Sequence, residues 1–287
     1  MNRDLLKVME EGMPSFSKGQ KRIAAYILGN CEKAAYMTAS KLSGLVGVSE
    51  STVVRFAIEL GFEGYPEFQK SLQSLLKNHL KSFQRVEVAN QLIGDGDVLD
   101  KVLLSDAERI RRTLEQVDKD SFSEAVSRIV GANDIYILGV RSSSYLAGTL
   151  NYYLRMVFDS VKLLQTTSGS ELFEQLLQIK KGDVLIAISF PRYSTRVINA
   201  VEFAGARGAD VVAITDSAAS PLAPYASQLL TAQSDMTSFV DSLVAPLSII
   251  NALIVAVSRE KQEELTARLR ELEEVWERYD VYSKKES

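Results

Sequence analysis

The sequence predicts an all-α domain at the N-terminus, followed by an α/β domain with a parallel sheet flanked by helices. Residues 1–80 hold a succession of amphipathic helical patterns. From Asn133 onward, short apolar runs alternate with helical stretches, as in a sheet whose strands are joined by helices. These apolar runs are continuous rather than alternating, which indicates strands buried on both faces of the sheet.

The expected boundaries are residues 1–80 for the helical domain, 81–104 for a connector, 105–259 for the sheet domain and 260–287 for a charged C-terminal helix. The chain has 287 residues, 46% of them hydrophobic, which is enough for two domains with buried cores. Its formal net charge of −4 argues against a basic nucleic-acid binder as a whole. Residues 1–80, however, carry 10 Lys and Arg against 8 Asp and Glu, so a polyanion is expected to dock there.

The composition also excludes several kinds of site. A single cysteine, Cys31, excludes an internal disulfide and a cysteine-based zinc site, and the single histidine, His79, argues against histidine-based metal sites. We therefore expect no metal and no cofactor. The first residues lack the apolar core of a signal peptide, and apolar runs are shorter than the roughly 18–20 residues of a membrane span. A cytosolic protein without a membrane segment is expected.

The first helices have clear sequence boundaries. Residues 2–11 form a short amphipathic pattern that Pro14 ends. Ser17 lies three residues before Gln20, which is the spacing of a capping box at the start of the next helix. Asn30 is expected to close that helix.

Residues 38–61 predict two short helices joined by a tight turn. Thr38 caps the first helix, Gly47 supplies the turn, Ser49 caps the second helix and Gly61 ends it. The apolar side of the first helix is expected to hold Ala39, Leu42, Leu45 and Val46.

The second helix separates polar from apolar residues. At 100° per residue, one side carries Val53, Phe56, Ala57 and Leu60. A helix-turn-helix needs such an apolar back and a front of small polar residues with a cation that reaches base edges. The candidate DNA-binding residues are Ser49, Ser51, Thr52 and Arg55. A generic helical hairpin with a solvated polar front remains the alternative.

The chain continues with a turn at residues 64–66 and a helix over 67–80, with Phe68, Leu72, Leu75 and Leu76 inside. Helices follow at 106–117 and 121–130. Strands are expected at 135–138, 161–164, 184–188, 211–214 and, at the sheet edge, 228–231, with helices at 145–158, 171–179, 195–207 and 239–258. The final helix, 260–282, has an apolar stripe that packs on its own domain or contacts a second subunit.

Two loops follow strands at the carboxyl edge of the sheet, where parallel sheets bind ligands. One spans Gly139–Ser144 and the other Ser189–Thr195. Hydroxyls, arginines and free amides at a helix N-terminus suit an anion such as a phosphorylated small molecule, although Ser and Thr also serve as simple helix caps. The candidate effector-binding residues are Arg141, Ser142, Ser143, Ser144, Ser189, Arg192, Ser194 and Thr195.

The run GVSESTVVRFAIELGFEGYPEFQKSL resembles the N-terminal domain of the RpiR/MurR family of bacterial transcriptional regulators. Residues 120–255 resemble a SIS (sugar isomerase) domain, the usual effector domain of that family, through ILGVRSSSYLAG and GDVLIAISFPRYSTRVINAVEFAGARGADVVAITD. The resemblance implies that the loop serines and Thr195 hold a sugar phosphate. The family's second loop usually reads Ser-x-Ser-Gly-x-Thr, whereas this chain has SFPRYST. Either Arg192 takes over anion recognition, or the effector is not a usual sugar phosphate.

Three classes of function are compatible with these patterns. The leading hypothesis is a non-enzymatic transcription factor that binds operator DNA as a homodimer or higher homo-oligomer and senses a sugar phosphate or related anion. The rival is a sugar-phosphate isomerase, or an enzyme that processes amino-sugar phosphates, with an accessory helical domain. Glu171 is one glutamate available as its base. The third is a scaffold without a ligand.

Overall fold

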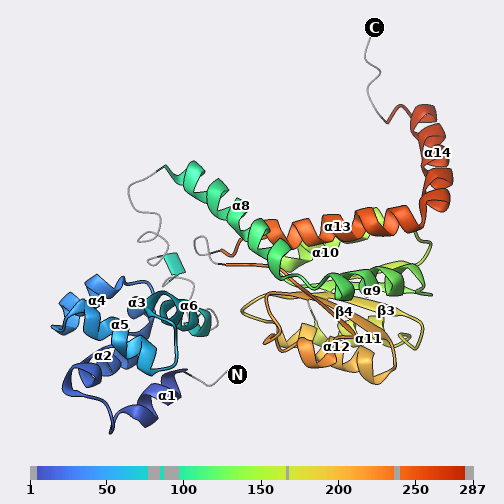
Figure 1. Ribbon diagram of the computed structural model, residues 1–287. Coiled ribbons are helices and arrows are strands. Elements are labelled where there is room, and N and C mark those ends of the chain that lie inside the picture. Colours follow the sequence, from blue (N-terminus) through green and yellow to red (C-terminus); the bar gives the residue numbers. More distant parts are fainter. Residues whose placement is uncertain (1–4, 77–84, 87–96, 166–167, 236–239, 282–287) are drawn as a thin grey trace. The chain divides into compact units, whose positions relative to one another are not determined.

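The computed structural model describes residues 5–76, 85–86, 97–165, 168–235 and 240–281 (Figure 1). The chain divides into two compact units, one with the N-terminal helices and the other with the sheet. Each unit is described by itself. The all-α and α/β classes expected from the sequence are both confirmed.

The first unit is built from short helices with side-chain caps. The capping box of Ser17 and Gln20 is present, Thr38 accepts a hydrogen bond from the Lys41 amide, and Ser49 accepts one from the Thr52 amide. The helices are α1 (Leu5–Gly12), α2 (Lys18–Gly29), α3 (Cys31–Ala34), α4 (Ala39–Val46), α5 (Glu50–Glu59) and α6 (Tyr65–Leu76).

Aromatic rings form the centre of this unit. Phe56 of α5 contacts Phe16 and Phe68 in edge-to-face geometry, with ring centroids 5.3 and 6.2 Å apart. Phe62 contacts the same Phe68 at 5.5 Å, and the Tyr65 hydroxyl donates a 2.8 Å hydrogen bond to the Met37 carbonyl. The aromatic residues of the LGF and GYPEF segments, which carry the family resemblance, therefore pack in or against the core that holds α5 against α6.

Two details of this unit differ from the sequence prediction. Helix α6 begins at Tyr65 rather than after a turn at 64–66, because proline is tolerated in the first turn, where its missing N–H has no helical partner. Leu45 is 56% exposed, whereas Ser43 is buried, so the buried face of α4 is rotated away from the predicted one. The side chains of Leu75 and Leu76, and the predicted helical residues 77–80, lie outside the described part.

Helix α8 (Val98–Gln116) starts inside the stretch expected to be a connector. The Asp97 carboxylate accepts hydrogen bonds from the amides of Leu99 and Asp100 at 2.8 and 3.4 Å and so caps this helix within the predicted connector. Helix α9 (Lys119–Val130) follows, capped by Asp118.

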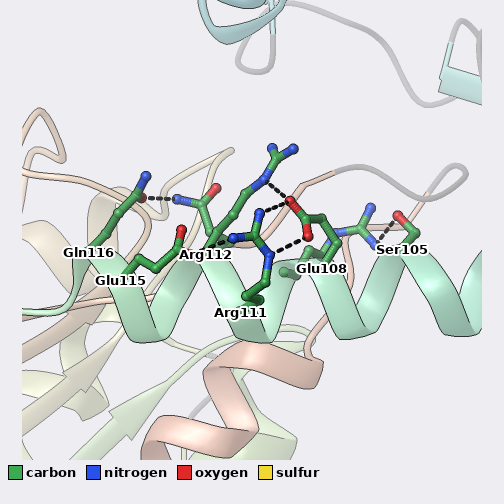
Figure 2. A network of polar contacts seen from close by, with 8 residues as sticks. Ser105, Glu108, Arg111, Arg112, Glu115 and Gln116 are labelled. Carbon is green, nitrogen blue, oxygen red and sulfur yellow. Dashed lines mark hydrogen bonds and ion pairs between the residues drawn. The ribbon is translucent and has the colours of Figure 1, made fainter.

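The outward side of α8 carries a chain of charged contacts (Figure 2). Glu108 accepts hydrogen bonds from both Arg111 and Arg112, and these bonds lower its pKa to about 2. Arg111 also pairs with Glu115 one turn further along. The pairs link positions three and four residues apart, which supports the helix locally.

The second unit contains a five-stranded parallel sheet in the order β2-β1-β3-β4-β5, so the predicted edge strand is at an edge. The strands are β1 (Ile135–Gly139), β2 (Val161–Leu164), β3 (Val184–Ile188), β4 (Asp210–Thr215) and β5 (Gln228–Thr231). The helices that join or follow them are α10 (Ser143–Leu154), α11 (Gly169–Leu176), α12 (Thr195–Ala206), η1 (Ala223–Tyr225), α13 (Val244–Glu260) and α14 (Gln262–Arg278).

Helices cover both faces of the sheet (Figure 1). One core contains Ile137 and Ile186 with residues of α9, α10 and α13, and the other contains Tyr136 and Leu185 with residues of α11 and α12. From β1 the chain moves first to β2 on one side and then to β3 on the other. The switch point between β1 and β3 therefore lies where the two loops of interest leave the sheet.

The last helices differ from their predicted form. Helix α13 begins at Val244, and the predicted start at Phe239 lies outside the described residues. Helix α14 has no buried residue, and its stripe of Leu265, Leu269, Leu272 and Trp276 is half-exposed. Arg268 anchors the helix to its own unit, since it pairs with Asp159 and donates to the Arg155 carbonyl at 3.3 Å.

Within the described ranges, no helix is long and apolar enough to span a membrane. The same part of the chain holds no group of three or more His, Cys, Asp or Glu residues arranged to bind a metal ion.

Candidate functional site

The turn between α4 and α5 has the geometry of a helix-turn-helix. Gly47 ends α4 in the left-handed region with φ of 65°. The Arg22 guanidinium of α2 donates to the Gly47 carbonyl at 3.1 Å, and a Cβ at position 47 would lie 2.6 Å from that guanidinium. The left-handed backbone conformation therefore favours glycine at this turn, whereas the guanidinium is the end of a flexible side chain that can shift.

The predicted DNA-binding residues lie on or beside α5 with different exposure. Ser51 and Arg55 are exposed, while Thr52 is half-buried with its methyl group facing Gly19 of α2. The Ser49 hydroxyl caps the helix and is hydrogen-bonded to the hydroxyls of Ser51 and Thr52, at 2.9 and 2.7 Å. Arg55 is thus the long cationic side chain on this face, and the three hydroxyls form a small polar surface at the helix start.

Sequence reasoning did not include α2 in this surface. Lys18, Lys21 and Arg22 are exposed on α2, and Arg22 contacts the turn directly. Three cations in the first turns of one helix are a sequence feature that could have indicated a contact with DNA phosphates.

In the second unit, the loop after β1 is held in a strained turn. Arg141 has a φ of 55°, which is unusual for a residue other than glycine and recurs at functional sites. Its carbonyl accepts hydrogen bonds from the Ser144 amide at 3.0 Å and the Ser144 hydroxyl at 2.6 Å. Gly139 is needed here because a Cβ would lie 2.3 Å from the Ser143 carbonyl oxygen.

The loop after β3 leaves hydroxyls available at the start of α12. Ser194 occupies the N-cap position, but its side chain makes no capping hydrogen bond, and Ser142 of the first loop makes none at α10. The alternative that these serines act only as caps is therefore not supported. Tyr193 donates a hydrogen bond to the Asp216 carboxylate after β4, and burial together with that carboxylate raises the pKa of Tyr193 above its ordinary value.

Two cavities adjoin these loops. The larger, of about 680 Å³, is lined by Leu138, Gly139, Val140, Arg141, Ser144, Leu164, Gln165, Glu171, Leu172 and Arg196. The smaller, of about 370 Å³, is lined by Val140, Arg141, Arg192, Tyr193, Ser194, Thr195 and Arg196. Since Val140, Arg141 and Arg196 line both, the cavities are neighbours at the switch point. Their volumes are typical of small-molecule sites.

The cavities divide the predicted effector-binding residues into two sets. Arg141, Ser144, Arg192, Ser194 and Thr195 line one or both of them. Ser142, Ser143 and Ser189 line neither. Ser143 is buried in the first turn of α10. Ser189 is only 3% exposed, and its amide donates a hydrogen bond to the Ile214 carbonyl that extends the strand ladder.

Three polar or charged residues that line the larger cavity were not among the predicted effector-binding residues: Gln165, Glu171 and Arg196. Arg196 directly follows the predicted Ser194-Thr195 pair, so its position was a usable signal. Gln165 and Glu171 come from the β2–α11 region, which the sequence did not associate with the two loops.

Comparison with protein families assigns both units. Residues 3–79 match the helix-turn-helix domain of the rpiR family, and residues 128–256 match the SIS domain. An uncharacterised helix-turn-helix-type transcriptional regulator of Caldanaerobacter subterraneus subsp. tengcongensis is 26% identical over 95% of this chain and 96% of its own length. A regulator of the same description from Clostridium perfringens is 24% identical over 89% of this chain and 92% of its own length.

Solved structures share the fold. NanR of Vibrio vulnificus, determined in complex with ManNAc-6P, is 24% identical with a TM-score of 0.60, covering 98% of this chain and 100% of that one. The sugar isomerase domain of an RpiR transcription factor from Sphaerobacter thermophilus is 26% identical with a TM-score of 0.58, covering 61% of this chain and 97% of that one. With an N-terminal helix-turn-helix domain of the rpiR type followed by a SIS domain, the chain belongs to the RpiR family of transcriptional regulators.

Proposed function

We propose that this regulator binds operator DNA through α5 and that a sugar phosphate or related anion, bound in its SIS domain, modulates that binding. The exposed Arg55 reaches guanine O6 and N7, while the hydroxyls of Ser49, Ser51 and Thr52 meet phosphates or base edges. Lys18, Lys21 and Arg22 of α2 add sequence-independent contacts to the phosphate backbone.

The observation that carries the ligand proposal is the lining of the smaller cavity. It holds three arginines together with Ser194 and Thr195 at the N-terminus of α12. Neither hydroxyl makes a hydrogen bond with the described residues, and the N-terminal amides and the helix dipole of α12 favour negative charge. Such a site suits a phosphate group. In the usual glycine-containing loop the backbone binds the phosphate, and in this chain Arg192 would bind it instead.

NanR of Vibrio vulnificus supports the ligand class, because that protein, which has the same fold over its full length, was solved with a sugar phosphate bound. The second loop of this chain departs from the usual pattern, so its effector need not be the ligand that NanR binds. We regard phosphorylated sugars as the class to test first.

A homodimer follows from the mode of DNA binding. One helix-turn-helix with a small positive excess binds weakly, whereas two linked copies gain from a high effective concentration at paired half-sites. The ligand regulates operator binding if it has different affinities for the DNA-bound and free arrangements of the dimer.

The direct test is a gel shift with the intact protein on DNA from upstream of its own gene. Specific binding that changes when a panel of sugar phosphates is added is the expected result. Absence of specific binding, both with and without the panel, would contradict the proposal.

A second function has one observation in its favour. Glu171 lines the larger cavity, and an isomerase needs a base such as a carboxylate to take a proton from the bound sugar. The relatives are named as transcriptional regulators, which favours the first function. Turnover of aldose or ketose phosphates by the purified protein, lost in Glu171→Gln, would establish the isomerase instead.

A further inference from the structure

The two neighbouring cavities carry charge very unequally. The smaller one is lined by Arg141, Arg192 and Arg196 and by no carboxylate. The larger one shares two of these arginines but adds Glu171, from the first turn of α11. The joined site is therefore cationic at the end near α12 and has one negative charge in its larger part.

This distribution matches one phosphate group and no second anion. A phosphate monoester carries about −1.5 to −2 charges at neutral pH and pairs with arginine through two parallel hydrogen bonds. Arg196 and Arg141 pair with no carboxylate among the described residues, so their charges are available to such a group. With the phosphate in the smaller cavity, the body of the ligand extends into the larger one.

The far end of the ligand then meets Glu171. A hydroxyl or an ammonium group there donates to the carboxylate, and Gln165 and Ser144 offer further polar contacts in the same cavity. A carboxylate or a second phosphate of the ligand at that end would face the negative charge of Glu171, and the two negative groups would repel each other. The apolar surface of Leu138, Leu164 and Leu172 gives no compensation for that charge.

We infer that Glu171 is a specificity-determining residue: the SIS domain selects sugar monophosphates with a neutral or cationic far end and rejects phosphorylated sugar acids and bisphosphates, while Arg196 is a further phosphate-binding residue. The inference rests on the proposed function, because it requires that the site bind a phosphate ester. It narrows the class of effector to compounds with a single anionic group.

The test uses the full chain and a matched pair of ligands. Glucose 6-phosphate and 6-phosphogluconate share a carbon chain and phosphate, but the second has a carboxylate at the far end. Their dissociation constants are measured by calorimetry for the wild type, Glu171→Gln and Glu174→Gln. Glu174 is an exposed residue of the same helix that lines neither cavity, so its variant controls for the loss of one negative charge. Inorganic phosphate serves as a third probe of the cationic end.

We expect the wild type to prefer glucose 6-phosphate, and Glu171→Gln to improve relative binding of 6-phosphogluconate by about tenfold. Glu174→Gln should leave the ratio unchanged, and Arg196→Ala should weaken binding of both esters and of inorganic phosphate. If the esters bind but the ratio does not respond to Glu171→Gln, or responds equally to Glu174→Gln, the selectivity inference is wrong and the phosphate site stands. If none of the three probes binds, the proposed function fails together with the inference.

Discussion

Arg55 is the residue on which the proposed DNA contact depends most. It is exposed on α5, whose opposite side is anchored in the core by Val53, Phe56 and Ala57. If Arg55 reads a base, Arg55→Ala should cost about 1–3 kcal/mol of operator binding and relax sequence preference at one position. Fluorescence anisotropy with operator and scrambled DNA measures both effects.

The control for Arg55→Ala is ligand binding, which should be unchanged because the SIS domain is a separate unit. Lys21→Ala on α2 should instead weaken binding to operator and scrambled DNA alike and reduce the salt dependence. Unchanged operator affinity in Arg55→Ala would show that another face of the unit contacts DNA.

Tyr65 gives the helix-turn-helix unit a specific alkaline sensitivity. Burial raises the pKa of its phenol from 10.0 to about 12, and the hydroxyl donates to Met37. Because the folded-state pKa is the higher one, this stabilisation is complete below about pH 10 and is lost as the pH rises towards 12.

Tyr65→Phe should therefore lower stability by about 1 kcal/mol at neutral pH, the value of one hydrogen bond, and flatten the loss between pH 10 and 12. The Met37 carbonyl keeps a 2.7 Å hydrogen bond from Gln69, which limits the cost. Urea unfolding across this pH range measures the change. If the free energy of unfolding of Tyr65→Phe falls between pH 10 and 12 as steeply as that of the wild type, a group other than Tyr65 causes the loss.

At the scale of elements, the start of α10 depends on its close approach to the end of β1. A Cβ at Gly139 would meet the Ser143 carbonyl at 2.3 Å, so Gly139→Ala should displace the loop that carries Arg141. We expect most of the stabilisation by sugar phosphate in a thermal-shift assay to be lost.

Gly148→Ala is the matched control for this loop. No atom lies within 4 Å of a Cβ built at Gly148 on α10. The change should stabilise the helix by about 0.5–1 kcal/mol and preserve ligand binding. Equal ligand binding by Gly139→Ala and Gly148→Ala would show that the loop after β1 does not contribute to the ligand site.

We expect an exposed apolar stripe of α8 to contact a second copy of the chain. Leu99, Leu103, Ile110 and Leu114 are 39–66% exposed and fall within a narrow stripe of the helix at 100° per residue. The charged network of Glu108, Arg111 and Glu115 lies on another side of the helix and is not part of this stripe (Figure 2).

Introducing charge into that stripe should prevent self-association. We expect Leu103→Glu with Leu114→Glu to shift the protein towards monomer in sedimentation velocity and to weaken operator binding. Leu104→Glu is the control, because Leu104 is 72% exposed but points away from the stripe. If the double variant remains dimeric, the dimer contact lies elsewhere.

At the scale of the whole molecule, two compact units should respond differently to a ligand of the SIS domain. A sugar phosphate that binds only the folded sheet unit raises the free energy of unfolding of that unit by RT ln(1 + [L]/Kd), and its unfolding temperature rises with it. We expect calorimetry to show this shift for the sheet unit, with unfolding of the helix-turn-helix unit unaffected in the absence of DNA. A shift confined to the helical unit would place the ligand there.

Much of the fold could be predicted because local signals specify it. The caps at Ser17, Thr38 and Ser49 and the glycine turn at Gly47 follow from single-residue chemistry. The continuous apolar strands predicted the parallel sheet. The errors lie where the environment decides. Asp97 caps α8 inside the predicted connector, and Leu45 has the spacing of a core residue, but the packing of α4 turns it outward.

The sequence by itself determined the two fold classes, the helix-turn-helix and the two loops at the carboxyl edge of the sheet, because these depend on periodicity, caps and motifs within short segments. Only the tertiary structure decided which side chains line the cavities. It buried Ser143 and Ser189, and it brought Glu171 of α11 into the lining of the same cavity as Arg141 and Arg196. Those positions are far apart in the chain, and the parallel sheet joins them only because its strand order reverses between β1 and β3.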